Sequence, residues 1–594
     1  MAYPNRNLLW THTFVDELAR GGLRAVCIAP GSRSTPLTIA FAEHPQIRVY
    51  SLIDERSASF FALGLALATD QPVAVVCSSG TATANFYPAV IEAHYSGVPL
   101  LILTADRPPE LRDSGANQTV DQVKLYGDHV LWSVDVAVPE AEPSALTLRS
   151  LRTLACRAAA RANGLPRGPV HLNFPFRKPL EPIPVSSDVT DQPGYAPRPD
   201  ARPFTQIARG RLLPDPAQIA PIAEQVMGAR RGLIVCGPRC PRGDFPAAVT
   251  QLAAAAGFPI LADPLSGVRF GAHTDGAPVI GGYDTFLPTG TLSAPDLVLH
   301  FGAEPTSQML INYLEAAPDA ARVWFSADGI WLDADHRADH VLWADPAASC
   351  AQIAAALGSV RDPNRAWLDQ WRAAEGACWG AIEQAQAGEW FDGAVVAEVA
   401  DALPDGGQIF IGNSLPVRHL DQFARPSAKS LRTYGSRGAS GIDGVTSTAL
   451  GAAAATDTPL ALVTGDLSFY HDMNGLMAVA RCGVKAVIVV INNDGGGIFR
   501  RLPVAEFDPP FTELFLTPHG LQFEPVVRMY GLDYARVEAA QPNARADFRA
   551  AFAAALAAER ATVIEVITDS ARDLELRRAL LRQVSDALGA LKRV

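Results

Sequence analysis

The chain has 594 residues, of which 48% are hydrophobic and 19% are charged, and its formal net charge at pH 7 is −12. At roughly 100–200 residues per domain this length predicts three or four domains, and the composition is that of an ordinary globular protein. The acidic balance argues against non-specific nucleic-acid binding, and no apolar run approaches the roughly 20 residues of a membrane-spanning helix.

The start of the chain and its cysteines bear on the compartment. The first residues, MAYPNRNLLWTHTF, contain no basic region followed by an apolar core, so we predict no signal peptide. The eight cysteines are scattered, and the close pair Cys236 and Cys240 alone is poor evidence for zinc. We therefore expect a cytoplasmic protein with reduced thiols.

Residues 1–180 alternate short apolar runs with helical patterns such as TPLTIAFAEH and SASFFALGLALAT. Continuous β-branched runs bounded by Gly, Pro or Asp are typical of strands buried on both faces. The expected strands are AVCIAP, RVYSLID, VAVVCSS and PLLILTAD. This βαβ series predicts a first α/β domain with a doubly wound, mostly parallel sheet.

The rest of the chain continues in the same style after a break. Residues 181–204 are rich in Pro, Asp and Ser without periodicity, which predicts a linker. A second α/β domain is expected over 205–360, and it lacks a G-x-G-x-x-G turn after its first strand, so no dinucleotide site is predicted. A third is expected over 361–594, ending in the strand TVIEVIT and an amphipathic helix that reaches Val594.

The third domain contains two apolar runs that each end in a polar cluster. LALVTG precedes Asp466, AVIVVI precedes Asn493, and the residues between the two runs can form a helix. Adjacent parallel strands would bring both side chains to one carboxyl edge, where open α/β sheets bind ligands. Carboxylate, amide and carbonyl oxygens suit Mg²⁺ that also holds phosphates, although a helix cap and a turn would use the same residues.

Two motifs in the first domain allow both structural and functional interpretations. Residues 30–36, PGSRSTP, follow the first strand and could cap a helix or bind an anion through backbone N–H groups and Arg33. Glu55 follows the second strand, where it could favour the dipole of the next helix or hold and move a proton.

Arginines occur repeatedly at predicted strand ends. They are Arg33, Arg107, Arg418 and Arg437. Each taken singly is explained by solvation or a salt bridge, but together they predict a pocket for a substrate with several carboxylates. The glycine-rich stretch 437–444 also allows a close approach of the backbone to a phosphate.

In combination these motifs resemble those of thiamine-diphosphate-dependent enzymes. The resemblance is carried by Gly465-Asp466 followed by Asn492-Asn493, by Glu55, and by the stretches APGSRSTPL, SSGTATANFYPAV, TADRPPELRDSGANQT, GNSLPVR, SRGASGIDG, GDLSFYHD and NNDGGGIF. Within this family the chain is most similar to carboligases of menaquinone and phylloquinone biosynthesis. The resemblance implies a pyrimidine-binding, a central and a diphosphate-binding domain, in a homodimer or dimer of dimers with active sites at the subunit interface.

The resemblance also implies an activity and roles for individual residues. The expected reaction is decarboxylation of 2-oxoglutarate and addition of its four-carbon remnant to isochorismate. Glu55 would activate the cofactor, and Mg²⁺ or Mn²⁺ would be bound by Asp466, Asn493 and Gly495. The expected cofactor contacts are Ser414, Ser440, Ile442, Leu467 and Ser468. The expected substrate contacts are Ser32, Arg33, Arg107, Asn117, Gln118, Arg418, Arg437, Ile498, Phe499 and Leu502.

Two departures and two alternatives qualify the resemblance. Gln308 stands where close relatives tend to carry a substrate-binding lysine, and the metal motif reads Gly-Asp-Leu instead of Gly-Asp-Gly. One alternative is another thiamine-dependent 2-oxoacid decarboxylase or an acetohydroxyacid-type synthase, against which the arginine set argues. The other is a non-catalytic cofactor-binding regulator, against which the intact Glu55, Asp466 and Asn493 argue.

Overall fold

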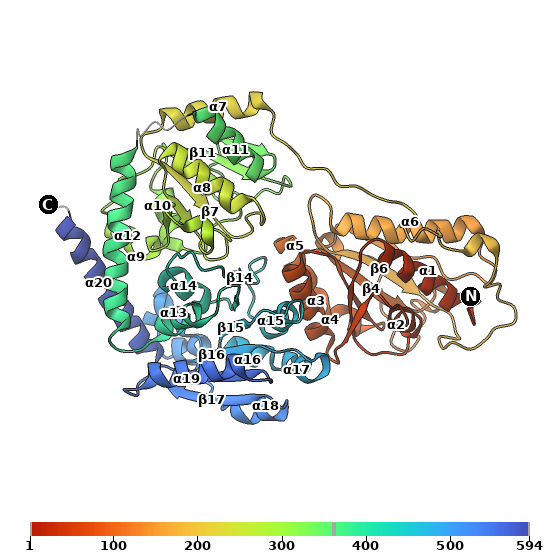
Figure 1. Ribbon diagram of the computed structural model, residues 1–594. Helices are drawn as coiled ribbons and strands as arrows, with labels where there is room; N and C mark the ends of the chain where they lie inside the picture. The colour runs from red at the N-terminus through yellow and green to blue at the C-terminus, as the bar shows by residue number, and fades with distance from the viewer. Residues whose placement is uncertain (1–2, 359–363, 592–594) are drawn as a thin grey trace. The chain divides into compact units, whose positions relative to one another are not determined.

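The computed structural model describes residues 3–358 and 364–591 (Figure 1). The predicted boundary between the second and third domains, at 360/361, and the predicted helix end at Val594 lie outside the described residues. In the described parts the strands form three six-stranded sheets. All pairings between these strands are parallel, which confirms the predicted fold class.

The first sheet has the strand order β2-β1-β3-β4-β6-β5. Its central strands are the buried apolar runs that the sequence predicts, whereas β5 and β6 were not predicted. The strands are β1 (Ala25–Ile28), β2 (Arg48–Ser51), β3 (Val73–Cys77), β4 (Leu100–Asp106), β5 (Trp132–Asp135) and β6 (Val170–Pro175). The main helices around it are α1 (Arg6–Arg20), α2 (Thr35–Ala42), α3 (Glu55–Thr69), α5 (Tyr87–Ser96) and α6 (Ala145–Ala162).

The second sheet has the order β12-β11-β10-β7-β8-β9, in which the chain starts at the centre and winds outward in both directions. Its strands are β7 (Gly232–Cys236), β8 (Ile260–Ala262), β9 (Val279–Ile280), β10 (Leu297–Phe301), β11 (Ala321–Ser326) and β12 (His340–Trp343). Its main helices are α7 (Pro216–Gly228), α8 (Phe245–Ala256), α10 (Gln308–Glu315) and α11 (Pro346–Leu357).

The third sheet, β14-β13-β15-β16-β18-β17, repeats the order of the first sheet strand for strand. Its strands are β13 (Gln408–Ile411), β14 (Arg432–Tyr434), β15 (Leu460–Gly465), β16 (Val487–Asn492), β17 (Asp533–Glu538) and β18 (Thr562–Ile567). Its helices include α12 (Arg365–Gln386), α13 (Asp392–Ala402), α14 (Leu415–Phe423), α15 (Val445–Ala454), α16 (Asp466–His471), α17 (Met477–Cys482), α19 (Ala544–Ala557) and α20 (Ser570–Leu591).

The segment between β15 and β16 is not one helix. A 3₁₀ turn at Met473–Leu476 separates α16 from α17. The reason is a close approach: a Cβ on Gly475 would lie 2.4 Å from the Ser447 hydroxyl, and the Asp472 carboxylate accepts a hydrogen bond from the Ser447 N–H at 2.6 Å. The segment therefore follows the surface of α15 instead of continuing as a regular helix.

The chain packs as two compact units. The first unit comprises Met1–Arg209, Ser436–Asp457 and His471–Lys485, and the second comprises Gly210–Gly435, Thr458–Tyr470 and Ala486–Val594. The first unit thus contains the first sheet together with α15 and α17. The second and third sheets belong to the second unit.

In the first unit, α3 and α15 touch backbone to backbone. A Cβ on Gly64 of α3 would lie 1.9 Å from the Thr448 carbonyl oxygen, and a Cβ on Gly451 of α15 would lie 2.0 Å from the Phe61 carbonyl oxygen. Glycine at both positions is what allows two helices to approach this closely. The contact fixes α3, whose first residue is Glu55.

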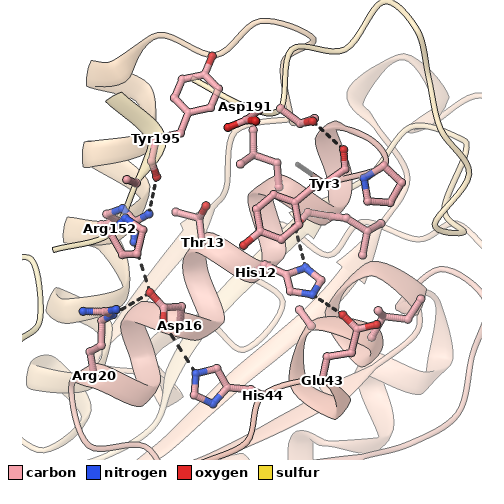
Figure 2. Close-up of a pocket in the computed structure, with 18 of the residues that line it drawn as sticks. Tyr3, His12, Thr13, Asp16, Arg20, Glu43, His44, Arg152, Asp191 and Tyr195 are labelled. Atoms are coloured by element: carbon pink, nitrogen blue, oxygen red, sulfur yellow. Dashed lines mark hydrogen bonds and ion pairs between the residues drawn. The ribbon is translucent and has the colours of Figure 1, made fainter. Parts of the chain in front are cut away.

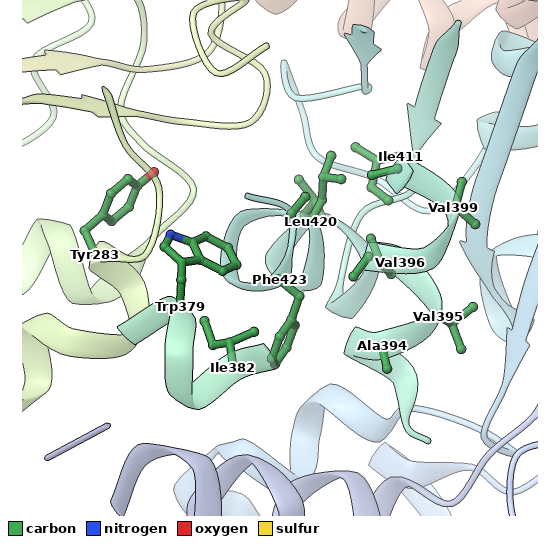
Figure 3. Close-up of a cluster of buried hydrophobic side chains, with 14 of the residues drawn as sticks. Tyr283, Trp379, Ile382, Ala394, Val395, Val396, Val399, Ile411, Leu420 and Phe423 are labelled. Carbon is green, nitrogen blue, oxygen red and sulfur yellow. The ribbon is translucent and has the colours of Figure 1, made fainter. Parts of the chain in front are cut away.

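In the second unit, one apolar core joins the central and third sheets. Trp379 and Ile382 of α12 and Val395 of α13 belong to it, together with Leu420 and Phe423 of α14 (Figure 3). A fully buried ion pair stands beside this core. Arg269 donates to Asp421 Oδ1 at 2.5 Å and to the Ala262 and Asp421 carbonyls at 2.6 Å, and the hydroxyl of Tyr283 donates to the same carboxylate.

Removing one partner of this pair is expected to destabilise the second unit strongly. Asp421→Ala leaves the Arg269 charge buried without its carboxylate, which typically costs about 3–5 kcal/mol. The apparent free energy of unfolding in urea measures the effect. The matched control is Glu383→Ala, which removes an ion pair with Arg425 in which both side chains are more than half exposed, and it should cost no more than about 1 kcal/mol. Equal effects of the two variants would contradict this interpretation.

Candidate active site

The carboxyl ends of β15 and β16 bring the two predicted metal-site segments together in the second unit. The strands pair in parallel with Gly465 opposite Ile491, so Asp466 and Asn493 leave the sheet at the same edge. The Gly495 N–H donates to Asp466 Oδ2 at 2.9 Å, and the Leu467 N–H donates to Oδ1 at 2.6 Å. The proximity that the sequence predicted is therefore present.

Asn493 presents an oxygen that lacks a donor. Its amide nitrogen donates to Asp392 Oδ2 at 3.3 Å, while its Oδ1 is buried and has no hydrogen-bond partner among the described residues. Buried polar atoms are almost always satisfied, so this amide oxygen is suited to a bound cation. No cluster of three or more His, Cys, Asp or Glu side chains occurs in the described residues. A hard cation held by carboxylate, amide and carbonyl oxygens fits this edge.

Glycine is required at position 495. Its φ is +134°, and a Cβ there would lie 2.0 Å from the Leu516 carbonyl oxygen. The loop after Asn493 therefore lies directly against the segment that contains Leu516. This contact holds the Gly495 peptide where its N–H reaches Asp466.

His519 also lies at this edge, and the sequence gave no reason to select it. Its Nδ1 accepts from the Leu521 N–H at 2.9 Å, so in the neutral ring Nε2 carries the proton. That Nε2 lies 3.2 Å from Asp466 Oδ2. Burial raises the pKa of Asp466, while the N–H groups of Gly495 and Leu467 and the His519 ring oppose the rise. No motif links a histidine at this separation to Asp466, and only the fold reveals it.

The other predicted residues of the second unit lie on segments next to these strands. Ser414 caps α14 with a φ of +70°, and the Arg418 guanidinium donates to its carbonyl at 2.7 Å. Ile498 and Phe499 are in a 3₁₀ turn at Gly497–Arg501, followed by the half-exposed Leu502. Leu467 and Ser468 are in the first turn of α16.

The turn with Ile498 and Phe499 is anchored through Arg501. Its guanidinium lies 2.9 Å from His419 Nε2 and 3.2 Å from the buried Asp573 carboxylate. Burial and three neighbouring arginines lower the pKa of His419, so the ring is neutral and accepts this hydrogen bond. The anchor connects the turn to α14 and α20.

Gln308 is the first residue of α10, after the N-cap Ser307. It is exposed, and its amide donates to Asn312 Oδ1 at 2.9 Å, one helical turn further on. This contact holds the side chain on the helix surface.

In the first unit, Glu55 is the first residue of α3 and is half-buried. Residues on both sides of it are fixed. Asp54 caps α3 through the Ser57 N–H at 3.0 Å, and Arg56 donates to the His471 carbonyl at 2.7 Å. The buried Asp472 lies 3.5 Å from the Ser57 hydroxyl, and burial raises its pKa to about 6. The turn that carries Glu55 is thus rigidly held.

Arg33 and Arg107 are neighbours in the first unit. Burial lowers the pKa of both groups, and the charge of Arg107 lowers that of Arg33 further. Arg107 donates to the Ser79 hydroxyl, and that hydroxyl and the Ser79 carbonyl both bond to Gln118 at 3.0 Å. Ser79 therefore organises this arginine pocket, although the sequence did not single it out. Ser32 and Asn117 lie exposed on adjoining loops.

The loop that contains Arg437, Ser440 and Ile442 also belongs to the first unit. Ser440 has a φ of +60°, and the Ile442 side chain is 36% exposed although it is apolar. The loop leads into α15 through Gly444, where a Cβ would lie 2.1 Å from the Phe60 ring of α3. The structure therefore couples this loop to the helix that begins at Glu55.

A cavity of about 730 Å³ lies elsewhere in the first unit, between α1, α2 and the linker (Figure 2). None of the predicted site residues lines it. Its charged side chains pair with one another, with Arg20 2.8 Å from Asp16 and His12 2.8 Å from Glu43. It is therefore separate from the candidate active site.

Family models match three consecutive parts of the chain. Residues 10–125 match the thiamine pyrophosphate enzyme N-terminal TPP binding domain, residues 211–411 match the middle domain of thiamine pyrophosphate enzymes, and residues 418–566 match the C-terminal TPP binding domain. The fold and the site thus define a thiamine-diphosphate enzyme. In the described residues, no helix has the length and apolarity needed to cross a bilayer.

Full-length relatives narrow this class. A 2-succinyl-5-enolpyruvyl-6-hydroxy-3-cyclohexene-1-carboxylate synthase of Roseiflexus castenholzii is 55% identical over 99% of this chain and 100% of its own length. Synthases of the same name from Haloarcula marismortui and Halorubrum lacusprofundi are 48% and 45% identical, each over 99% of this chain and at least 99% of their own lengths. The chain belongs to the family of these synthases, which confirms the resemblance drawn from the motifs.

Gly495→Ala is expected to disrupt the edge beside Asp466. The added Cβ would meet the Leu516 carbonyl and force an unfavourable φ, so both the melting temperature and the affinity for Mg²⁺ should fall. Differential scanning fluorimetry and calorimetric titration with Mg²⁺ and thiamine diphosphate measure these quantities. The control is Gly376→Ala in α12, where a Cβ meets nothing within 4 Å and a helix gains up to about 1 kcal/mol from alanine. If Gly495→Ala were as harmless as this control, the steric argument would be wrong.

Proposed function

We propose that this chain catalyses the decarboxylation of 2-oxoglutarate and the conjugate addition of the resulting succinyl-semialdehyde carbanion to isochorismate. The products would be 2-succinyl-5-enolpyruvyl-6-hydroxy-3-cyclohexene-1-carboxylate and CO₂, in menaquinone or phylloquinone biosynthesis. The observation that carries the proposal is the Asp466–Asn493–Gly495 edge in a chain that matches synthases of this name over its full length. A thiamine-dependent decarboxylase of another kind and a non-catalytic regulator are less well supported by the same relatives.

Mg²⁺ or Mn²⁺ would be held by Asp466, the Asn493 amide oxygen and the Gly495 carbonyl. When bound, thiamine diphosphate supplies the electron sink that stabilises the carbanion. Glu55 would accept or hold the proton at the aminopyrimidine ring nitrogen, and Ile442 would pack between the two rings. Ser414, Ser440, Leu467 and Ser468 would contact the diphosphate.

The substrates would be bound mainly through their carboxylates. Arg33 and Arg107 lie close together in a partly buried site, and an anionic ligand would offset the cost of keeping two guanidinium groups there. Ser32, Asn117, Gln118, Arg418 and Arg437 would complete the polar contacts. Ile498, Phe499 and Leu502 would form an apolar wall that limits access of water.

We further propose a homodimer or dimer of dimers in the cytoplasm, with active sites at the subunit interface. Glu55 of one subunit would then act on the cofactor held by Asp466 and Asn493 of the other. Sedimentation equilibrium tests the oligomeric state.

Purified protein supplied with 2-oxoglutarate, isochorismate, thiamine diphosphate and Mg²⁺ should consume isochorismate and form a product of the expected mass. Glu55→Gln should lower kcat by roughly 100-fold or more, because an amide cannot exchange the proton. Its affinity for the cofactor should change only a few-fold. The control Glu43→Gln, on the exposed end of α2, should leave turnover unchanged. Without adduct formation by the wild-type protein, the assignment of substrates would be wrong.

Asp466→Asn should weaken binding of the metal and the cofactor together. The amide keeps the shape of the carboxylate but loses the charge that attracts a hard cation. Calorimetric titration of thiamine diphosphate, with and without Mg²⁺, should show that metal lowers the Kd of the wild type but not of the variant. A variant that still responds to Mg²⁺ would remove Asp466 from the proposed metal site.

A further inference from the structure

Glu92 is a buried carboxylate that contacts the loop with Arg437. It lies on α5 and is 3% exposed. The Gly438 N–H donates to its Oε1 at 2.8 Å, and the Ala439 N–H donates to its Oε2 at 2.7 Å. The Ser96 hydroxyl donates to Oε1 at 2.5 Å. Both oxygens are thus engaged by peptides that are adjacent in the chain, and both partners belong to the first unit.

Keeping this carboxylate ionised inside the protein has a cost. Burial raises the pKa of Glu92, whereas the Ser96 hydroxyl, the two N–H donors and the charge of Arg437 lower it. A carboxylate that accepts from two consecutive N–H groups fixes the orientation of both peptides, because each oxygen accepts one charge-assisted hydrogen bond. A neutral glutamine could accept at one oxygen only, and its NH₂ group would face an N–H donor.

Sterics restrict the same loop from the other side. A Cβ on Gly438 would lie 2.7 Å from the Ser96 hydroxyl and 2.8 Å from the Glu92 carbonyl oxygen. The backbone at Gly438 is therefore already in contact with α5 and cannot move closer. The hydrogen bonds to Glu92 prevent it from moving away, so the loop has a single position.

We infer that Glu92 is a positioning residue that fixes the 437–442 loop and thereby the Arg437 guanidinium that binds a substrate carboxylate. Arg437 immediately precedes the two bonded peptides, so a rotation of the Gly438 peptide changes the direction of its side chain. This inference rests on the proposed function, which makes Arg437 a substrate contact. It adds that substrate affinity depends on a residue of the first sheet's helical layer that itself touches no substrate.

Glu92→Gln in the full-length protein tests the inference. The KM of the substrate that Arg437 binds should rise about tenfold, as expected for the loss of a buried, charge-assisted hydrogen bond. The kcat should change less than KM. Hydrogen exchange of the Gly438 and Ala439 amides, followed by mass spectrometry of the 436–444 peptide, should accelerate.

Ser96→Ala is the matched control, because it removes a hydrogen bond to the same carboxylate but leaves both loop amides bonded. It should lower the melting temperature somewhat without changing KM or the exchange of the loop amides. If Glu92 only stabilised α5, both variants would lower the melting temperature and neither would change KM. That result would overturn the inference.

A double-mutant cycle separates this inference from the proposed function. Arg437→Ala alone identifies the substrate by the KM that it raises, and adding Glu92→Gln to it should raise that KM little further, because the two residues act as one unit. If Arg437→Ala changed neither KM, the proposed role of Arg437 would be wrong. If Arg437→Ala raised a KM but Glu92→Gln did not, or if the two effects multiplied independently, only the positioning role would be wrong.

Discussion

The parallel register of β15 and β16 is the constraint on which the candidate metal site depends. With Gly465 opposite Ile491, the next residues of both strands leave the sheet at one level, and the Gly495 N–H reaches the Asp466 carboxylate. A slip of two residues would displace one segment by nearly 7 Å, which no side-chain rotation could correct. The close contact of Gly495 with the Leu516 carbonyl fixes the same loop from its other side.

Buried charges recur at the positions where the structure holds a functional segment in place. Asp472 bonds the Ser447 N–H beside the turn that carries Glu55, Glu92 bonds two amides beside Arg437, and Asp573 bonds Arg501 beside Phe499. Each carboxylate is desolvated at a cost, and its hydrogen bonds to a defined partner offset that cost. Such contacts restrict the position of the segment, which apolar packing does less sharply.

The sequence predicted the features that leave a continuous local pattern. The central strands, the positions of Glu55 and Asp466 at strand ends, and the doubly wound class all follow from buried apolar runs and the polar residues after them. The strands β5 and β17 were missed because they are only partly buried and their sequences, WSVD and DYARVE, contain few apolar residues. His519, Ser79 and Glu92 were missed for another reason. Their key partners include backbone groups distant in the chain, and a hydrogen bond to a peptide leaves no signature in the partner's sequence.

The discontinuity of the first unit has a consequence for synthesis on the ribosome. Its first 209 residues are made early, but α15, which packs against Gly64 of α3, comes almost 400 residues later. At roughly 5–20 residues per second, this separation corresponds to a delay of about 20–80 s. During this time the face of α3 that α15 will cover is without its partner, so the nascent chain exposes a surface that chaperones and aggregation compete for.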